Sequence, residues 1–371
     1  MNNSAEFAKV ISSLEFDTPV TMASFDVESL FTNIPLQETT KLILDNSEDS
    51  LISSFGLDKQ FFASLLEIAT CSSIFKFKDK LYTQIDGVAM GSPLGPSYAN
   101  AFLCHHEKSW LDSCPLDFKP IFYRRYVDDT FLVFKDPSHI LKFSNYLNSQ
   151  HPNIKFTYEE EKDKQLAFLD VLITNLKTKF STDVYRKPTF TGLGINFRSC
   201  IPYIYKINSI KTLLHRAYST CSSWLTFHKE ASFLLNYFYN NQFPKHIFEK
   251  QLNKFLNSKL NPPPVIHTAK KDRKYIKLPY QGHSSYDMRK TLSKLLRTCY
   301  PQIDFRIAFS NNNTIGNFLK QNNHLPHTFD PMWYTNLHVL AVMLDTWVRP
   351  HVGCFTEYVN TKVYPLGPVT E

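Results

Sequence analysis

Hydrophobic positions recur along this chain with two different periods. Within residues 1–200, short apolar, aromatic and β-branched runs predict strands, and apolar residues spaced three or four apart predict helices between them. The expected strands are 21–27, the two flanks of Asp128-Asp129, 155–158, 167–173 and 180–187, with a strand or hairpin at 73–82. The expected helices are 6–14, 36–45, 59–70, 98–111 and 140–147. This alternation predicts a mixed α and β domain.

From Tyr203 onward the periodicity becomes helical. Three successive apolar stripes predict three helices, beginning near Tyr203, Trp224 and Pro244, with basic residues on their outer faces. A nucleic-acid-binding helical unit and a plain helical bundle fit this pattern about equally well. The basic residues of these outer faces are Lys206, Lys211, Arg216, Lys245, Lys250 and Lys254.

A proline run at 262–264 predicts a linker after the three helices. Beyond it, a basic cluster at 270–274 is followed by an expected strand, an amphipathic helix, a second strand and a short helix. Their ranges are 275–280, 285–298, 303–309 and 314–319. This succession predicts a small α/β module, and after residue 320 the pattern dissolves apart from a helical stretch at 337–347.

Composition narrows the class of protein. The chain has 371 residues, 43% hydrophobic and 20% charged, which indicates a folded protein with room for two or three domains. The formal net charge of +7 is compatible with a polyanionic partner. Seven scattered cysteines without a C-x-x-C pair predict neither a disulfide framework nor a zinc knuckle. No run is apolar and long enough to span a membrane, and the N-terminus does not have the pattern of a secretory signal.

The first candidate for chemistry is Asp128-Asp129, which interrupts a strand-forming run at the expected tip of a hairpin. Adjacent carboxylates repel each other, and a divalent cation would relieve the repulsion. A solvated turn is the alternative for an Asp-Asp pair taken alone. Two further elements favour chemistry: Asp26 ends a predicted core strand, and the loop Gly87–Pro96 combines small residues with the start of a helix. Carboxylates on two neighbouring strands can hold two divalent ions about 3.5–4 Å apart, the arrangement used in phosphoryl transfer.

Together these motifs resemble the palm of reverse transcriptases. Residues 25–31 (FDVESLF) resemble the first palm motif, 90–96 (MGSPLGP) the second and 126–129 (YVDD) the third. The amino-acid sequences of these motifs are similar to those of Penelope-like retroelements, which are relatives of telomerase reverse transcriptase. Further support comes from 26–35 (DVESLFTNIP), 87–96 (GVAMGSPLGP), 168–171 (FLDV) and 185–189 (YRKPT). The resemblance extends from about Asn3 to about Lys320.

The resemblance implies a set of residue roles. Asp26, Asp128 and Asp129 would be the catalytic acids and, together with the Val27 carbonyl, the ligands of two Mg²⁺ ions. Phe31 would be the steric gate that favours dNTPs, and Met90 and Gly91 would lie against the nucleotide. The primer and template would be bound by Tyr126, Tyr185, Arg186 and Lys187. Separately, the run Cys104-His105-His106-Glu107 holds two adjacent histidines that point in different directions on a helix, so it predicts no metal site.

The resemblance also sets the expected architecture and partners. The fold class is α+β: a palm with an antiparallel sheet and flanking helices, a helical thumb, and a small α/β extension. The expected domains are a partial palm at 1–200, a helix-turn-helix-like thumb at 201–261, a basic extension at 262–320 and a divergent tail at 321–371. The expected partners are an RNA template, a DNA primer and dNTPs, with no membrane, and the expected location is the nucleus.

The chain departs from the family in two respects. It begins close to Asp26, so the upstream fingers motifs are expected to be missing, and no C-terminal GIY-YIG endonuclease is recognisable. The leading hypothesis is an RNA-directed DNA polymerase module. The alternative is a catalytically inactive, truncated remnant that only binds nucleic acid.

Overall fold

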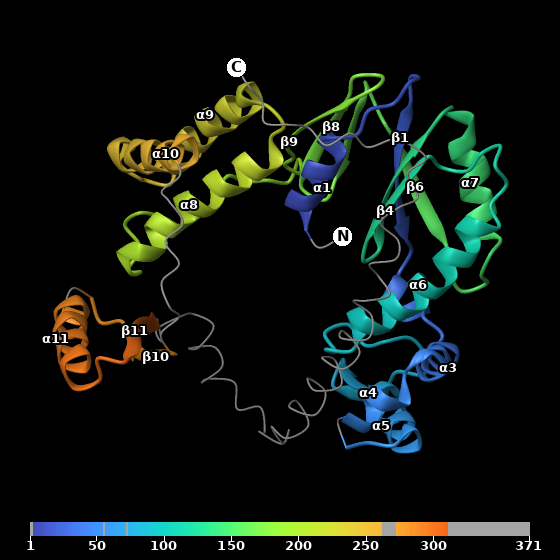
Figure 1. Ribbon diagram of the computed structural model, residues 1–371, viewed down its shortest axis with the longest axis horizontal. Helices are drawn as coiled ribbons and strands as arrows, with labels where there is room; N and C mark the ends of the chain where they lie inside the picture. The colour runs from blue at the N-terminus through green and yellow to red at the C-terminus, as the bar shows by residue number, and fades with distance from the viewer. Residues whose placement is uncertain (1–2, 55, 72, 262–271, 283, 311–371) are drawn as a thin grey trace. The chain divides into compact units, whose positions relative to one another are not determined.

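The computed structural model describes residues 3–54, 56–71, 73–261, 272–282 and 284–310 (Figure 1). The chain divides into two compact units, with the boundary between Tyr185 and Arg186. The expected tail at 321–371 and the expected helices at 314–319 and 337–347 lie outside the described residues.

The first unit is built around an antiparallel four-stranded sheet. In spatial order its strands are β4 (Phe122–Tyr126), β5 (Asp129–Phe134), β1 (Thr21–Val27) and β6 (Phe156–Glu160). The central strands β1 and β5 are rich in β-branched and aromatic residues, and nearly all their side chains are buried, as expected for strands covered on both faces.

Helices cover one face of this sheet, where Ala23 and Phe25 of β1 and Leu132 and Phe134 of β5 enter one hydrophobic core. These residues alternate along their strands because successive side chains point to opposite faces. The helices of this part of the chain are α2 (Leu30–Asn33), α3 (Leu36–Asn46), α4 (Asp49–Ser54), α5 (Lys59–Cys71), α6 (Gly95–Asp112) and α7 (Ser138–Asn148). Helix α6 starts three residues before the predicted start, since Pro96 fits the first turn of a helix.

A second core fills the opposite face of the sheet. There Met22, Phe131 and Val133 pack against helix α1 (Ser4–Ser12) and a three-stranded antiparallel sheet. The Phe7 ring of α1 lies 5.2 Å from the Phe131 ring and 4.7 Å from that of Phe168. The smaller sheet is formed by β7 (Gln165–Phe168), β8 (Val171–Asn175) and β9 (Phe180–Val184). Residues 73–82 form the expected hairpin, with strands β2 (Ile74–Phe77) and β3 (Lys80–Thr83).

The second unit contains the predicted three-helix group, formed by α8 (Tyr203–Thr220), α9 (Trp224–Asn240) and α10 (Lys245–Leu260). The three helices share one core, and Ser223 caps α9 in a capping box with Thr226. The α/β extension is also present, as β10 (Asp272–Pro279), α11 (Ser284–Cys299) and β11 (Ile303–Ser310), with the two strands parallel. The predicted α+β class is therefore confirmed. In the described part of the chain, no helix has the length and apolar character needed to cross a membrane.

Candidate active site

The predicted acids meet at one end of the central sheet. The antiparallel register of β1 and β5 places Asp26 directly opposite Asp129. Residues opposite each other share a face, with Cβ atoms about 4.5–5.5 Å apart. Along β1 and β5 this is the face of Met22 and Phe131, but the two acids lie at the strand ends, beyond the second core. The fold therefore brings two acids from distant parts of the sequence together at one end of the two central strands.

The third acid, Asp128, lies in the turn that joins β4 to β5. Tyr126 pairs with Asp129, so the two-residue tip is Val127-Asp128 and Asp129 already belongs to the strand. The expectation that the Asp-Asp pair itself forms the tip was wrong by one residue. Val127 has a φ of 57°, a conformation that is strained for a β-branched residue. Such strain persists only where the surroundings hold the backbone in place.

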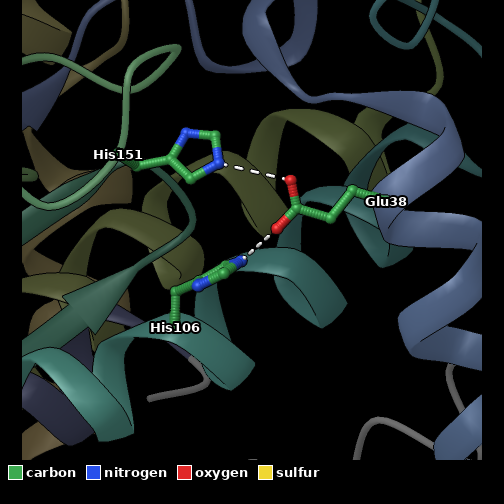
Figure 2. A group of neighbouring side chains, drawn as sticks. All are labelled: Glu38, His106 and His151. Atoms are coloured by element: carbon green, nitrogen blue, oxygen red, sulfur yellow. Dashed lines mark hydrogen bonds and ion pairs between the residues drawn. The ribbon is translucent and has the colours of Figure 1, made fainter.

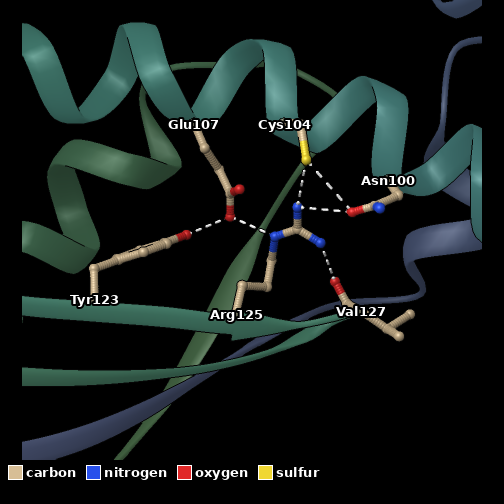
Figure 3. A network of polar contacts seen from close by, with 6 residues as sticks. All are labelled: Asn100, Cys104, Glu107, Tyr123, Arg125 and Val127. Carbon is tan, nitrogen blue, oxygen red and sulfur yellow. Dashed lines mark hydrogen bonds and ion pairs between the residues drawn. The ribbon is translucent and has the colours of Figure 1, made fainter. Parts of the chain in front are cut away.

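A buried polar network lies beneath this turn and supplies that support (Figure 3). The Nη1 of Arg125 donates a hydrogen bond to the Val127 carbonyl at 2.8 Å, and its Nε donates to the Glu107 carboxylate of α6 at 2.6 Å. The side chains of Arg125 and Glu107 are only 8% and 6% exposed, so this ion pair is well shielded from water. The Tyr123 hydroxyl donates to the same carboxylate, and the Arg125 Nη2 reaches Asn100. The guanidinium thus fixes the turn to α6 through three of its nitrogens.

The protonation states in this network are those that its hydrogen bonds require. Burial, the largest single effect, lowers the pKa of Arg125, but the Glu107 charge and hydrogen bond, together with Cys104 and Tyr123, raise the pKa overall, so the side chain stays charged. Burial and the Glu107 charge together raise the pKa of Tyr123, which keeps the hydroxyl as a donor. Sequence reasoning missed this network, although the double arginine before the third motif was a visible signal.

The electrostatics of the acids suit a cation. Burial, and then the neighbouring Asp128 charge, raise the pKa of Asp26. A bound divalent cation would reverse this effect, and the all-oxygen donor set of carboxylates is the type that Mg²⁺ prefers. Among the described residues, the three carboxylates do not all lie within 4.8 Å of one another. The donor chemistry fits a divalent metal, and the carboxylates would have to move closer together to bind one ion jointly.

The loop Gly87–Pro96, which contains the second predicted motif, contacts helix α2 at the end of the first predicted motif. The Val88 backbone N–H donates to the Phe31 carbonyl of α2 at 2.6 Å. Gly87 has a φ of +74°, and a Cβ at that position would lie 2.4 Å from the Thr32 carbonyl oxygen, so only glycine fits. The Asp86 carboxylate accepts from the Leu36 backbone N–H at the start of α3. Residues 86–88 are thus held beside Phe31.

The residues expected to contact the nucleotide differ in their environment. Phe31 is half-buried and packs against the first core, and its ring edge lies 3.6 Å from where a Cβ on Gly95 would be. Met90 is 74% exposed, and Gly91, at a φ of +93°, has open space around it. Val27 is buried at the end of β1, where its backbone pairs with Phe156. Phe31 is therefore a fixed wall, whereas Met90 and Gly91 are free to contact a ligand.

The four residues expected to bind primer and template fall into two groups. Tyr126 ends β4 beside the acids, and Tyr185 follows β9, where its backbone N–H donates to the Asp170 carbonyl at 2.9 Å. Arg186 belongs to the second unit, where its Nη1 donates to Glu230 at 2.8 Å and its guanidinium stacks 3.7 Å from the centre of the Phe233 ring. Lys187 is exposed. The charge of Arg186 is already paired within its own unit, and Tyr126 is held beside the acids because its backbone pairs with Asp129.

Comparison with solved structures finds several proteins with partial structural similarity to this chain. Telomerase from Candida albicans, in complex with a TWJ fragment of telomeric RNA, is 15% identical with a TM-score of 0.47, covering 69% of this chain and 47% of the telomerase. Telomerase from Candida tropicalis, with the same kind of RNA fragment, is 12% identical with a TM-score of 0.41, covering 96% and 52%. The native protease–reverse transcriptase of prototype foamy virus is 14% identical with a TM-score of 0.27, covering 95% and 45%. The chain spans about half the length of these proteins.

Family sequence models give a firmer assignment. No curated protein matches the chain. Residues 194–253 match the animal helix-turn-helix domain, a range that takes in α8, α9 and the first half of α10. Residues 12–197, half of the chain, match the reverse transcriptase (RNA-dependent DNA polymerase) family, and this range holds all three acids and the Gly87–Pro96 loop. The chain therefore belongs to the reverse transcriptase family.

Proposed function

We propose that this chain is the RNA-directed DNA polymerase module of a Penelope-like retroelement, which extends a DNA primer on an RNA template with dNTPs. The observation that carries the proposal is the pairing of Asp26 with Asp129 at the ends of the central strands, with Asp128 in the adjoining turn. The amino-acid sequences of the motifs at 26–35, 87–96 and 185–189 support the Penelope-like subtype. A nuclear location is proposed from the expected substrate.

In this proposal Asp26, Asp128 and Asp129, with the Val27 carbonyl, would hold two Mg²⁺ ions. When bound, such ions lower the pKa of the attacking hydroxyl and neutralise charge on the leaving phosphate. The protein's own contribution is positioning: Arg125 holds the Val127 carbonyl and so fixes the turn that carries Asp128. Phe31 would close the nucleotide pocket on the side of the ribose 2′-hydroxyl. Tyr126, Tyr185, Arg186 and Lys187 would contact primer and template, with Arg186 first releasing Glu230.

Primer extension by the purified chain tests this proposal. The assay supplies an RNA template annealed to a DNA primer, dNTPs and Mg²⁺, and compares wild type with Asp26→Asn and Asp128→Asn. Asp117→Asn is the matched control, because Asp117 is an exposed acid of the same unit. We expect extension by wild type and control, and its loss in both active-site variants. No extension by wild type, or equal extension by Asp128→Asn, would refute the proposal.

The helix-turn-helix match favours a second candidate function, binding of nucleic acid without polymerisation. Exposed Lys211 on α8 and exposed Lys250 and Lys254 on α10 supply positive charge for phosphate contacts. Salt-dependent binding to an RNA–DNA hybrid by a chain that fails to extend primers would support this candidate. Binding that is insensitive to salt would contradict it.

A further inference from the structure

Three side chains from distant segments of the first unit converge (Figure 2). They are Glu38 in the first turn of α3, His106 of α6, and His151 in the loop after α7. The His106 Nε2 lies 2.8 Å from the Glu38 Oε1, and the His151 Nε2 lies 3.3 Å from the Glu38 Oε2. All three candidate ligand atoms lie within 4.8 Å of one another.

We propose that Glu38, His106 and His151 form a Zn²⁺ site. Two imidazole nitrogens and one carboxylate oxygen are a ligand set typical of zinc, which leaves a fourth position for water. Hard cations such as Mg²⁺ prefer oxygen ligands, so we expect this site and the carboxylates of Asp26, Asp128 and Asp129 to select different metals.

The distances are close to those that zinc requires. With bonds of about 2.0–2.1 Å, the ligand atoms of a tetrahedral site lie about 3.3 Å apart. The His106 Nε2 lies 2.8 Å from Oε1 and the His151 Nε2 lies 3.3 Å from Oε2 of the Glu38 carboxylate, and one ligand atom from each residue lies within 4.8 Å of the other two. The Glu38 side chain is 39% exposed, which leaves it room to adjust toward a metal ion.

The surroundings hold the two histidines in position. The imidazole side chains are only 19% and 12% exposed. The Phe102 ring lies 4.6 Å from the His106 ring and 5.2 Å from the His151 ring, and the Trp110 ring stacks on His106 at 5.4 Å. An apolar wall around nitrogen ligands limits their rotamers, so less freedom is lost on binding. The exposed Glu38 side leaves a path for the ion and a water.

Binding requires a proton rearrangement at both histidines, because the Nε2 of each one donates to the Glu38 carboxylate and must lose its hydrogen to bind zinc. The His151 Nδ1 accepts a hydrogen bond from the Asn153 backbone N–H at 3.2 Å, so its Nε2 carries the hydrogen that faces Glu38. Ligation through Nε2 moves that hydrogen to Nδ1 and releases the Asn153 N–H. Asn153 is exposed, so water replaces the lost bond at small cost.

A zinc ion at this site would cross-link three segments of the first unit. It joins α3 and the loop after α7 to α6, and the residue after His106 on α6 is Glu107, which holds Arg125 under the Asp128 turn. Zinc would therefore stabilise the helix on which the turn is anchored, without contacting the acids.

The test uses the full chain, stripped with a chelator, dialysed, and titrated with Zn²⁺ in excess Mg²⁺, which keeps the acids occupied. Bound zinc per chain, zinc affinity by competition with a chromophoric chelator, and the thermal midpoint are measured. The variants are Glu38→Gln, His106→Gln and His151→Gln. His105→Gln is the matched control, because this neighbouring histidine is exposed on the same helix and lies outside the cluster.

We expect one Zn²⁺ per chain and a higher thermal midpoint for wild type and His105→Gln. Each ligand variant should lose at least about 100-fold in zinc affinity, since even partners of ligands are worth 10- to 100-fold. Glu38→Gln keeps a side-chain acceptor on an exposed helix turn, so it tests the proposal even if a histidine variant fails to fold. Equal affinity for wild type and Glu38→Gln, or no bound zinc in wild type, overturns the proposal. The outcome is independent of primer extension.

Discussion

Replacing Arg125 with methionine should both destabilise the first unit and loosen the turn that carries Asp128. Methionine keeps an unbranched apolar stem but removes the bonds to Glu107 and to the Val127 carbonyl, and it leaves the 6%-exposed Glu107 carboxylate without its cation. Breaking a buried ion pair by removing one partner costs about 3–5 kcal/mol. For a domain of this size, that loss lowers the thermal midpoint by roughly 6–20 °C. Lysine cannot substitute, because one ammonium cannot reproduce the several directions of the guanidinium fork.

A double-mutant cycle separates the ion pair from the rest of the network. Glu107→Gln keeps an acceptor for Tyr123 and leaves the Arg125–Val127 bond possible, so it should lower stability but spare most of the activity. Arg125→Met should also lower primer extension at temperatures where the variant is fully folded, because Val127 is no longer held at its positive φ. The double variant should be more stable than the sum of the two losses predicts, by about 2–3 kcal/mol. Additive losses, or full activity of folded Arg125→Met, would show that the network does not position the turn.

Two further predictions concern the loop beside Phe31. Gly87→Ala should lower stability by about 1–3 kcal/mol, because the new Cβ meets the Thr32 carbonyl in a backbone conformation suited to glycine, and a thermal melt that matches wild type would contradict this. Phe31→Ala should raise rNTP incorporation relative to dNTP by about 10- to 100-fold, as the wall facing the ribose is removed. Single-nucleotide extension measures that ratio, and an unchanged ratio would exclude Phe31 as the steric gate.

The sequence determined the local elements and the types of residue at the active site. The apolar, aromatic and β-branched run at 21–27 and the helical stripes after Tyr203 predicted β1 and the three helices of the second unit within a few residues. These signals are local, because the period of apolar residues follows directly from strand and helix geometry. The acids and the Gly87–Pro96 loop were visible for the same reason, as short runs with unusual chemistry.

Only the tertiary structure decided which residues meet. The antiparallel register sets Asp26 against Asp129, and a shift of one residue would send every side chain to the other face. Val127, and not an aspartate, adopts the left-handed backbone conformation of the turn, because strand pairing begins at Asp129.

The histidine cluster shows the same limit of local reasoning. Of the adjacent His105 and His106, only His106 belongs to the cluster, and its partners come from α3 and from the loop after α7. No local pattern encodes such contacts, because they depend on how packed helices and strands bring distant segments together.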